Sequence, residues 1–193
     1  MYHHLQQHIS KYVTLTSDEW TVCQGAFLSK PVRKKHYLLQ QQEVCKYLAF
    51  VEEGLLRSFT VDSRGTEHII QFALPGWWIS DMFSFLTGEP SIYTIEALED
   101  SQVLLLDGHS QEQLFEQVPK MERYFRQLLQ KNYIATHRRL EGSLSQTAEE
   151  KYAALIATYP QIIQSVPQHM IASYLGITPA FLSRLLNRKA HQK

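Results

Sequence analysis

The pattern of apolar and polar positions is most strand-like over residues 32–107. In this stretch apolar residues alternate with polar ones or form short uninterrupted runs, in segments rich in β-branched and aromatic side chains. Such segments are typical of strands. Turn-forming sequences such as Pro75-Gly76 separate them. Several short strands at this spacing predict an antiparallel sandwich or a small barrel.

Helical patterns precede the predicted strands. Leu5, Ile9 and Val13 recur every four residues, which predicts a short amphipathic helix over residues 2–13. Thr16 is followed three positions later by Glu19, the order of a capping box, so we expect a second helix to begin there.

The longest helical pattern follows the strands and spans residues 119–144. Ser110 and Gln113 have the order of a helix cap and predict a shorter helix before it, and Thr147 with Glu150 predicts another after a hinge at 144–147. The long helix carries an apolar stripe, and a helix of this kind often pairs with its copy in a dimer. The alternative is that it packs only on its own β domain. The residues expected at the dimer interface are Phe125, Leu128, Leu129, Tyr133 and Leu140.

Residues 167–189 have the pattern of two short helices around a tight turn. Gly176 suits the positive φ of a helix-to-turn junction, Thr178 is a good N-cap, and Pro179 is a good first helical residue. This pattern predicts a helix-turn-helix, whose second helix enters the major groove of DNA. The alternative is an ordinary pair of packed helices. The residues expected on the buried side of the second helix are Phe181, Leu182, Leu185 and Leu186.

Charge favours DNA binding by this segment. The chain has 19 basic and 19 acidic residues, but from Lys151 onwards it has five basic and no acidic ones, which leaves 14 basic and 19 acidic residues before that point. The net charges are therefore +5 and −5, and phosphate binding depends on such local positive charge. The residues expected to contact DNA are His169, Thr178, Ala180, Ser183, Arg184, Asn187, Arg188 and Lys189.

Composition narrows the remaining classes of protein. The 193 residues are enough for one large or two small domains, and no apolar run is long enough to span a membrane. Cys23 and Cys45 are too few for a disulfide framework or a four-cysteine iron–sulfur cluster, so we expect a cytoplasmic protein with free thiols. We predict no metal site for the N-terminal histidines, because no cysteine or carboxylate is in register with them.

The order of these segments resembles that of the Crp/Fnr family of bacterial regulators. The resemblance covers nearly the whole chain and rests on the segments YLAFVEEGLLRSF, TEHIIQFALPGWWISDMFSFLTGEPS, IEALEDSQVLLL and IASYLGITPAFLSRL. It implies an α+β fold, with an N-terminal double-stranded β-helix (jelly roll), a long dimerisation helix and a C-terminal helix-turn-helix domain of winged-helix-like type. The domain boundaries expected are 1–118, 119–144 and 145–193.

The resemblance also implies a function. We expect a homodimeric, sequence-specific DNA-binding transcription regulator with a palindromic operator, and RNA polymerase is the further partner that the family suggests. The chain ends soon after the second helix, so a wing would have to lie at residues 161–167 or be much reduced. Where the family often carries base-reading Arg and Glu residues, this sequence has Pro179 and Ala180. An interaction module without specific DNA readout is the alternative.

The effector region departs from the family pattern for cyclic nucleotides. That pattern has Gly-Glu, which binds the ribose, and then Arg-Ser, which binds the phosphate; here Ser80-Asp81 and Ser91-Ile92 stand in these places. A buried phosphate without a cationic partner is unfavourable by several kcal/mol. We therefore expect no cyclic AMP and no other cofactor, and the pocket is either filled or takes a less charged ligand. The residues expected around it are Ser80, Asp81, Met82, Phe83, Ser91, Ile92, Tyr93, Asn132, Thr136 and His137.

An enzyme built on the same β fold would need a cluster of metal ligands on facing strands. His68 is the only histidine between His36 and His109, so the sequence does not supply such a cluster. It also shows no dinucleotide-binding or phosphate-binding glycine motif. We predict no catalytic residues.

Overall fold

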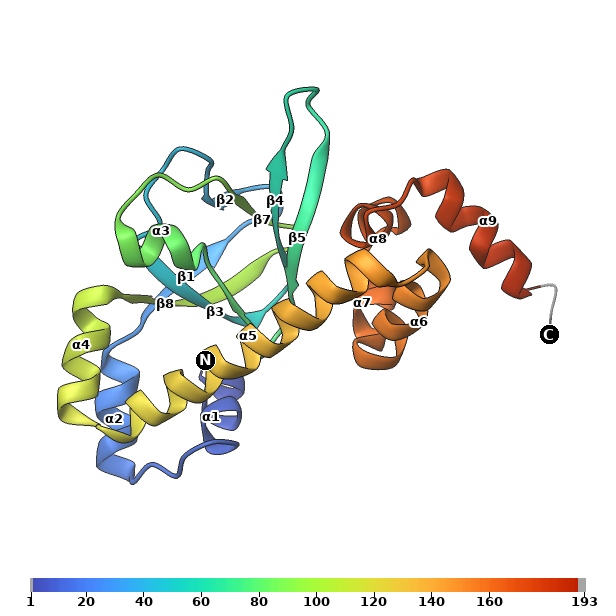
Figure 1. Cartoon of the computed structure of the whole chain (residues 1–193). Helices are drawn as coiled ribbons and strands as arrows, with labels where there is room; N and C mark the ends of the chain where they lie inside the picture. The colour runs from blue at the N-terminus through green and yellow to red at the C-terminus, as the bar shows by residue number, and fades with distance from the viewer. Residues whose placement is uncertain (1, 191–193) are drawn as a thin grey trace. The chain divides into compact units, whose positions relative to one another are not determined.

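The computed structural model describes residues 2–190, with side chains through Arg188 (Figure 1). These residues form two compact units, one made of residues up to 60 with 71–131 and the other of residues 61–70 with those from 132 onwards. In chain order the elements are α1 (His3–Ser10), α2 (Ser17–Gly25), β1 (Leu28–Val32), β2 (Tyr37–Leu39), β3 (Tyr47–Glu53), β4 (Leu56–Val61), β5 (Glu67–Ala73), β6 (Trp78–Ile79), α3 (Met82–Thr87), β7 (Thr94–Ala97), β8 (Ser101–Asp107), α4 (Gly108–Gln117), α5 (Lys120–Ser145), α6 (Ala148–Thr158), α7 (Pro160–Ser165), α8 (Gln168–Leu175) and α9 (Pro179–Ala190).

Two antiparallel sheets form the core of the first unit, as the sequence predicts. Their strand orders are β1-β8-β3-β6 and β2-β7-β4-β5. Strands alternate between two faces, so Val103 and Leu105 of β8 point to the space between the sheets while Leu104 and Leu106 point to the other side. This alternation lets β8 contribute to two apolar clusters at once.

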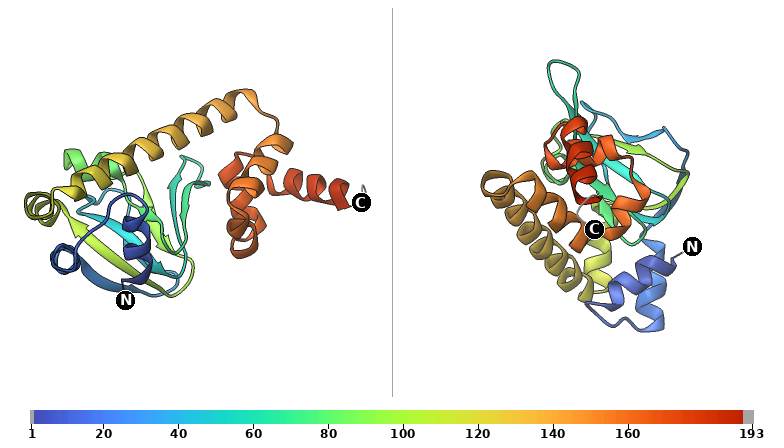
Figure 2. Two further views of the ribbon diagram at one scale, coloured as in Figure 1. Left: turned by 90° about the horizontal axis from the view of Figure 1, so that it is seen from below. Right: turned by 90° about the vertical axis from the view of Figure 1, so that its right-hand side faces the viewer.

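Helices cover the outer face of the sheet that contains β8. Leu5 and Ile9 of α1 pack with Phe50 of β3 and Leu104 of β8, and residues of α2, α4 and α5 complete this cluster. Figure 2 shows α1 and α2, coloured blue, beside the sheets of this unit. The helix predicted over residues 2–13 is therefore shorter than expected but buries the expected apolar face.

A buried carboxylate and a tight turn fix the start of α1 and the connection between β3 and β4. The Glu52 carboxylate accepts hydrogen bonds from the backbone N–H groups of His4 at 3.1 Å and Leu5 at 2.7 Å, and so caps α1 from strand β3. Gly54 connects β3 to β4 with φ +89°, and a Cβ there would lie 2.7 Å from the carbonyl oxygen of Asp100. Only glycine fits this turn without displacing the backbone.

The predicted helix starts are correct at two positions and wrong at a third. Thr16 and Thr147 both form the expected capping boxes. The helix predicted from Ser110 instead begins at Gly108, because Asp107 at the end of β8 accepts the Ser110 N–H at 2.9 Å. The hydrogen bonds that the Ser110 N–H and hydroxyl donate to the Asp107 carboxylate lower the pKa of Asp107.

In the second unit, the described chain after α5 forms helices. Its apolar contacts come from α6, α7, α8 and α9, and no strand occurs among its described residues after 132. Of the two expectations for a wing, its placement at residues 161–167 is wrong, since α7 covers most of that stretch and starts with Pro160, a favourable first helical residue. The buried side chains of this helical group are Tyr152, Leu155, Ile162, Val166, Ile171, Ala172, Leu175, Leu182 and Leu185.

The same unit includes the 61–70 segment of the β4–β5 hairpin. The Ser173 hydroxyl of α8 accepts from the Ile69 N–H at 3.1 Å and donates to the Glu67 carbonyl at 2.8 Å. Arg139 donates to the Ile69 and Tyr174 carbonyl oxygens and stacks on the Tyr174 ring. Side chains thus satisfy backbone groups of β5, which is the edge strand of its sheet.

In the described part of the chain, no helix has the length and apolar character needed to cross a bilayer.

Candidate nucleic-acid interface

The helix-turn-helix predicted from the sequence is present, formed by α8, the turn at Gly176 and α9. Gly176 takes φ +69°, and the Ile177 N–H donates to the Ala172 carbonyl at 3.0 Å, which closes the end of α8. Ala172 is fully buried, so its small side chain lies in the interior of this unit. The Thr178 hydroxyl accepts from the Phe181 N–H at 3.2 Å and so caps α9 as expected.

Most of the residues expected to contact DNA are on the outside of this unit. Helix α9 buries Leu182 and Leu185 and projects beyond the group formed by α6, α7 and α8 (Figure 1). The exposed members of the expected set are His169, Thr178, Ala180, Ser183, Arg184, Asn187 and Arg188. The side chain of Lys189 lies outside the described residues.

Phe181 corrects one expectation about α9. It was expected on the buried side, but 38% of its surface is exposed. The reason is helical geometry: Leu182 and Leu185 define the buried face, and Phe181 lies at its flank, on the same ridge as Arg184 three residues later. The Arg184 guanidinium lies 5.9 Å from the centre of the Phe181 ring, within the range of a cation–π contact.

The exposed ridge of α9 has the chemistry of a DNA-binding surface. Arg184 and Arg188 are one helical turn apart and exposed, and the chain has no acidic residue from Lys151 onwards. Arginine can hold guanine or a phosphate with two parallel hydrogen bonds. A projecting helix with this charge can enter a major groove.

Helix α5 exposes most of the apolar stripe predicted for a dimer interface. The exposed fractions are 44% for Leu129, 65% for Tyr133 and 56% for Leu140. Phe125 was expected with them, but it is only 4% exposed, because it packs in the core of its own unit together with Tyr124 and Trp78. Leu128 is also partly covered by that core.

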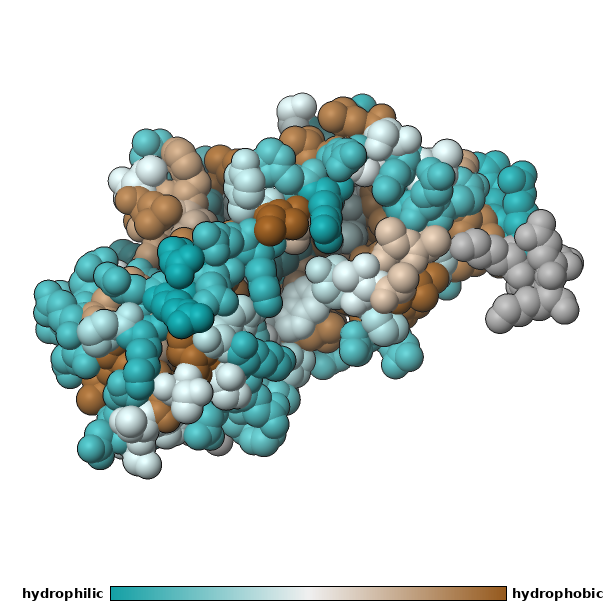
Figure 3. All heavy atoms as spheres, turned by 60° about the horizontal axis from the view of Figure 1, so that its bottom comes forward, coloured by the Kyte–Doolittle hydropathy of each residue, from teal (hydrophilic) through white to brown (hydrophobic). Residues whose placement is uncertain are grey.

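Separate patches of exposed apolar surface occur elsewhere on the described chain. Figure 3 shows hydrophilic surface interrupted by several brown patches on one face. Phe83, Leu86 and Ile92, on and near α3, are more than half exposed.

Asp81 and Ser91, which stand where the family pattern has its ribose-binding Glu and phosphate-binding Arg, are hydrogen-bonded to each other. The Asp81 carboxylate accepts from the Ser91 hydroxyl at 2.7 Å and from the Ser84 N–H at 3.2 Å, which caps α3. Asp81 and Ser91 are 2% and 1% exposed, and the Ser91 oxygen also accepts from the Tyr93 N–H at 3.0 Å. A ligand at this position would have to replace these hydrogen bonds.

The other residues expected around the effector do not share one environment. Phe83 and Ile92 point to solvent, whereas Ser80, Met82 and Tyr93 are partly buried. Asn132, Thr136 and His137 are exposed on the part of α5 that belongs to the second unit.

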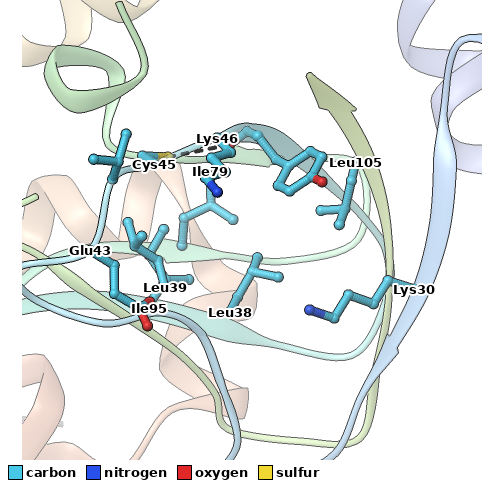
Figure 4. Close-up of a pocket in the computed structure, with 11 residues that line it drawn as sticks. Lys30, Leu38, Leu39, Glu43, Cys45, Lys46, Ile79, Ile95 and Leu105 are labelled. Atoms are coloured by element: carbon cyan, nitrogen blue, oxygen red, sulfur yellow. Dashed lines mark hydrogen bonds between the residues drawn. The ribbon is translucent and has the colours of Figure 1, made fainter. Parts of the chain in front are cut away.

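A cavity of about 510 Å³ lies in the first unit, and none of its lining residues is among those predicted around the effector (Figure 4). Its apolar wall comes from both sheets, and the lining residues are Lys30, Leu38, Leu39, Glu43, Val44, Cys45, Lys46, Tyr47, Ile79, Ile95 and Leu105. Figure 4 shows the Lys30 side chain directed into this space beside Leu38. Burial raises the pKa of the Cys45 thiol, which donates to the Tyr47 carbonyl. The apolar residues of the cavity wall form no sequence motif. They come together only when distant strands pair.

Known proteins are similar to this chain in sequence and in fold. Residues 29–118 match the cyclic nucleotide-binding domain family. The regulatory protein HlyX of Actinobacillus pleuropneumoniae is 26% identical over 171 residues, which cover 82% of this chain and 70% of that protein. The fumarate and nitrate reduction regulatory protein of Vibrio cholerae is 24% identical over 170 residues, covering 82% of this chain and 67% of the relative. The structure of FixK2 from Bradyrhizobium japonicum has a similar fold, with a TM-score of 0.72, 22% identity and coverage of 86% of this chain and 85% of that one.

A jelly-roll β domain of the cyclic-nucleotide-binding type, a long helix and a C-terminal helix-turn-helix define a class of DNA-binding transcription regulators with a sensing domain. Within that class, the chain is similar over most of its length to regulators of the Crp/Fnr type, the family that its sequence segments resemble.

Proposed function

We propose that this protein acts as a homodimer that binds a palindromic DNA operator sequence-specifically and regulates transcription from it in the cytoplasm. The observation that carries the proposal is the exposed, basic ridge of α9 on a correctly capped helix-turn-helix. The regulatory names of its relatives support a regulatory rather than a catalytic role.

The homodimer is supported by the exposed stripe on α5. Leu129, Tyr133 and Leu140 recur at spacings of four and seven residues, so they lie on one side of the helix. A second copy of α5 would cover these side chains and remove their apolar surface from water. Two helix-turn-helix units held in this way bind half-sites about one helical turn of DNA apart. The position of the operator would then determine whether the bound dimer contacts RNA polymerase.

Cyclic AMP is not the proposed effector. Asp81 and Ser91 satisfy each other, and residues 65–122 contain no arginine to pair with a phosphate. We propose that the β domain is either vestigial as a sensor or takes a ligand without a phosphate group.

The test of this function compares DNA binding by the Arg184→Ala variant and the unaltered protein. Operators are first selected from random duplex DNA, with and without cyclic AMP, and we expect a palindrome that is independent of the nucleotide. Arg184→Ala should weaken binding to this operator by about 1–3 kcal/mol if Arg184 reads a base. If it contacts only phosphate, affinity should fall equally on all sequences, and the salt dependence should drop by about one ion.

Arg33→Ala is the matched control, because Arg33 is an exposed arginine of the β domain. It should leave binding unchanged. Failure to select any preferred sequence, or full operator affinity in Arg184→Ala with an unchanged salt dependence, would refute specific DNA reading by α9 and favour an interaction module.

A further inference from the structure

The first turn of α9 presents an unusual apolar surface at the position from which a recognition helix reads bases. Ala180 and Phe181 are both exposed there, although α9 has Leu182 and Leu185 available to pack against its own unit. In a helix-turn-helix the N-terminal residues of the second helix contact base edges. An aromatic side chain at this place is therefore positioned to face DNA.

The polar groups that could read bases from this turn are mostly absent or already hydrogen-bonded within the protein. The Thr178 hydroxyl oxygen accepts the Phe181 N–H, so this amide is not available to a phosphate. Pro179 has no N–H to donate. Ala180 has no polar side-chain atom. Side-chain hydrogen bonds to bases from within α9 therefore begin at Ser183 and Arg184, one turn further along the helix.

The Phe181 ring also lies beside a charged neighbour on the ridge. Arg184 is the residue three positions later and lies over the ring at 5.9 Å. The pair thus places an apolar contact and a two-pronged hydrogen-bond donor next to each other.

We propose that Phe181, assisted by Ala180, reads the C5-methyl groups of thymine in the operator, beside the base or phosphate that Arg184 contacts. Thymine is the base that offers a methyl group in the major groove, and alanine and phenylalanine side chains are among those that contact it. This inference rests on the proposed function, because it assigns a base preference to the same helix. The selected half-site should carry at least one thymine that Phe181 requires.

The test replaces thymine by uracil, which removes only the methyl group, at each position of the selected operator in turn. For the full-length protein, one or two replacements should weaken binding roughly 3- to 10-fold each, the value for loss of about one buried methyl contact. Phe181→Ala should bind the intact operator more weakly and should no longer distinguish thymine from uracil at those positions. Its affinity for non-specific DNA should be unchanged, which also shows that the variant is folded.

Two further variants sharpen the result. Phe181→Leu keeps an apolar side chain and should keep part of the methyl preference. Leu86→Ala removes an apolar side chain on α3 that is even more exposed, 72% against 38% for Phe181, and should change nothing.

Three outcomes would overturn the inference. If no uracil replacement weakens binding, or if Phe181→Ala keeps the full thymine preference, Phe181 does not read methyl groups while the proposed regulator function stands. If the protein shows no sequence preference at all, the inference and the proposed function fail together.

Discussion

At the residue scale, a partly buried chain of polar groups connects α1 to the β domain. The Trp78 indole N–H donates to the Tyr124 hydroxyl at 2.8 Å, and the Tyr124 hydroxyl lies 2.7 Å from Nδ1 of His8. The Tyr124 oxygen accepts from Trp78, so its own proton is best donated to a neutral His8. Burial, followed by the charges of Lys11 and Lys131, lowers the pKa of His8 from 6.5 to about 4. The folded protein therefore keeps this imidazole neutral.

This arrangement predicts a pH-dependent stability. The folded state binds fewer protons than the unfolded state between pH 6.5 and 4, so the contribution of His8 is complete above pH 6.5 and is lost as the pH falls toward 4. Unfolding in urea should show a free energy lower by roughly 1–2 kcal/mol at pH 5 than at pH 7 from this residue alone.

His8→Gln is the matched variant, because its amide oxygen can accept from Tyr124 but does not titrate. The pH dependence of the variant should be smaller by that amount. An equal loss of stability in both proteins would show that His8 does not titrate in the expected range.

At the element scale, the Glu52 carboxylate determines how α1 is attached. It is 4% exposed and caps two backbone N–H groups of the helix. Glu52→Ala would leave the buried Leu5 N–H and the partly buried His4 N–H without an acceptor, which should reduce the free energy of unfolding by about 1–3 kcal/mol. Urea unfolding measures this change, and hydrogen exchange at Leu5 should become faster.

The neighbouring Glu53 supplies the control. It is exposed, so Glu53→Ala should change stability by no more than about 0.5 kcal/mol. Similar effects of the two substitutions would mean that capping by Glu52 contributes little.

The elements show which features can be inferred from sequence. Capping boxes at Thr16 and Thr147 depend on residues three positions apart, so the sequence predicts them correctly. The start of α4 at Gly108 depends on where β8 ends, which the sequence pattern does not reveal. Helix α7 (Pro160–Ser165) lies where one of the two expectations placed a wing, although Pro160 at its first position is a helix-start signal.

Errors about which apolar residues of a helix are buried have one physical cause. Phe125 and Leu129 have the same apolar character and lie one turn apart on α5, but only Phe125 faces the core made by Trp78 and Tyr124. Periodicity identifies an apolar stripe without showing which part of it its own unit covers. The exposure of Phe181 was missed for the same reason, and the cavity beside Leu105 requires the pairing of distant strands.

At the scale of the whole molecule, charge and symmetry explain how a neutral chain can bind DNA. From Lys151 onwards the net charge is +5, and the earlier part carries −5. The acidic part contributes no attraction to phosphate, so affinity has to come from a small number of basic groups. Two copies presenting these groups to neighbouring half-sites gain affinity because the second contact becomes intramolecular.

The dimer can therefore be tested through DNA binding as well as through size. Leu129→Glu with Tyr133→Glu places two like charges on the exposed stripe of α5, where a partner helix would bury them unpaired. We expect this double variant to sediment as a monomer and to bind the palindromic operator at least about 100-fold more weakly, while it keeps the affinity for a single half-site.

Ile134→Glu is the control, because Ile134 is 50% exposed and lies away from the stripe. A double variant that remains dimeric and binds the palindrome normally would place the interface elsewhere on the molecule, whereas a monomer with full operator affinity would show that one copy is sufficient for recognition.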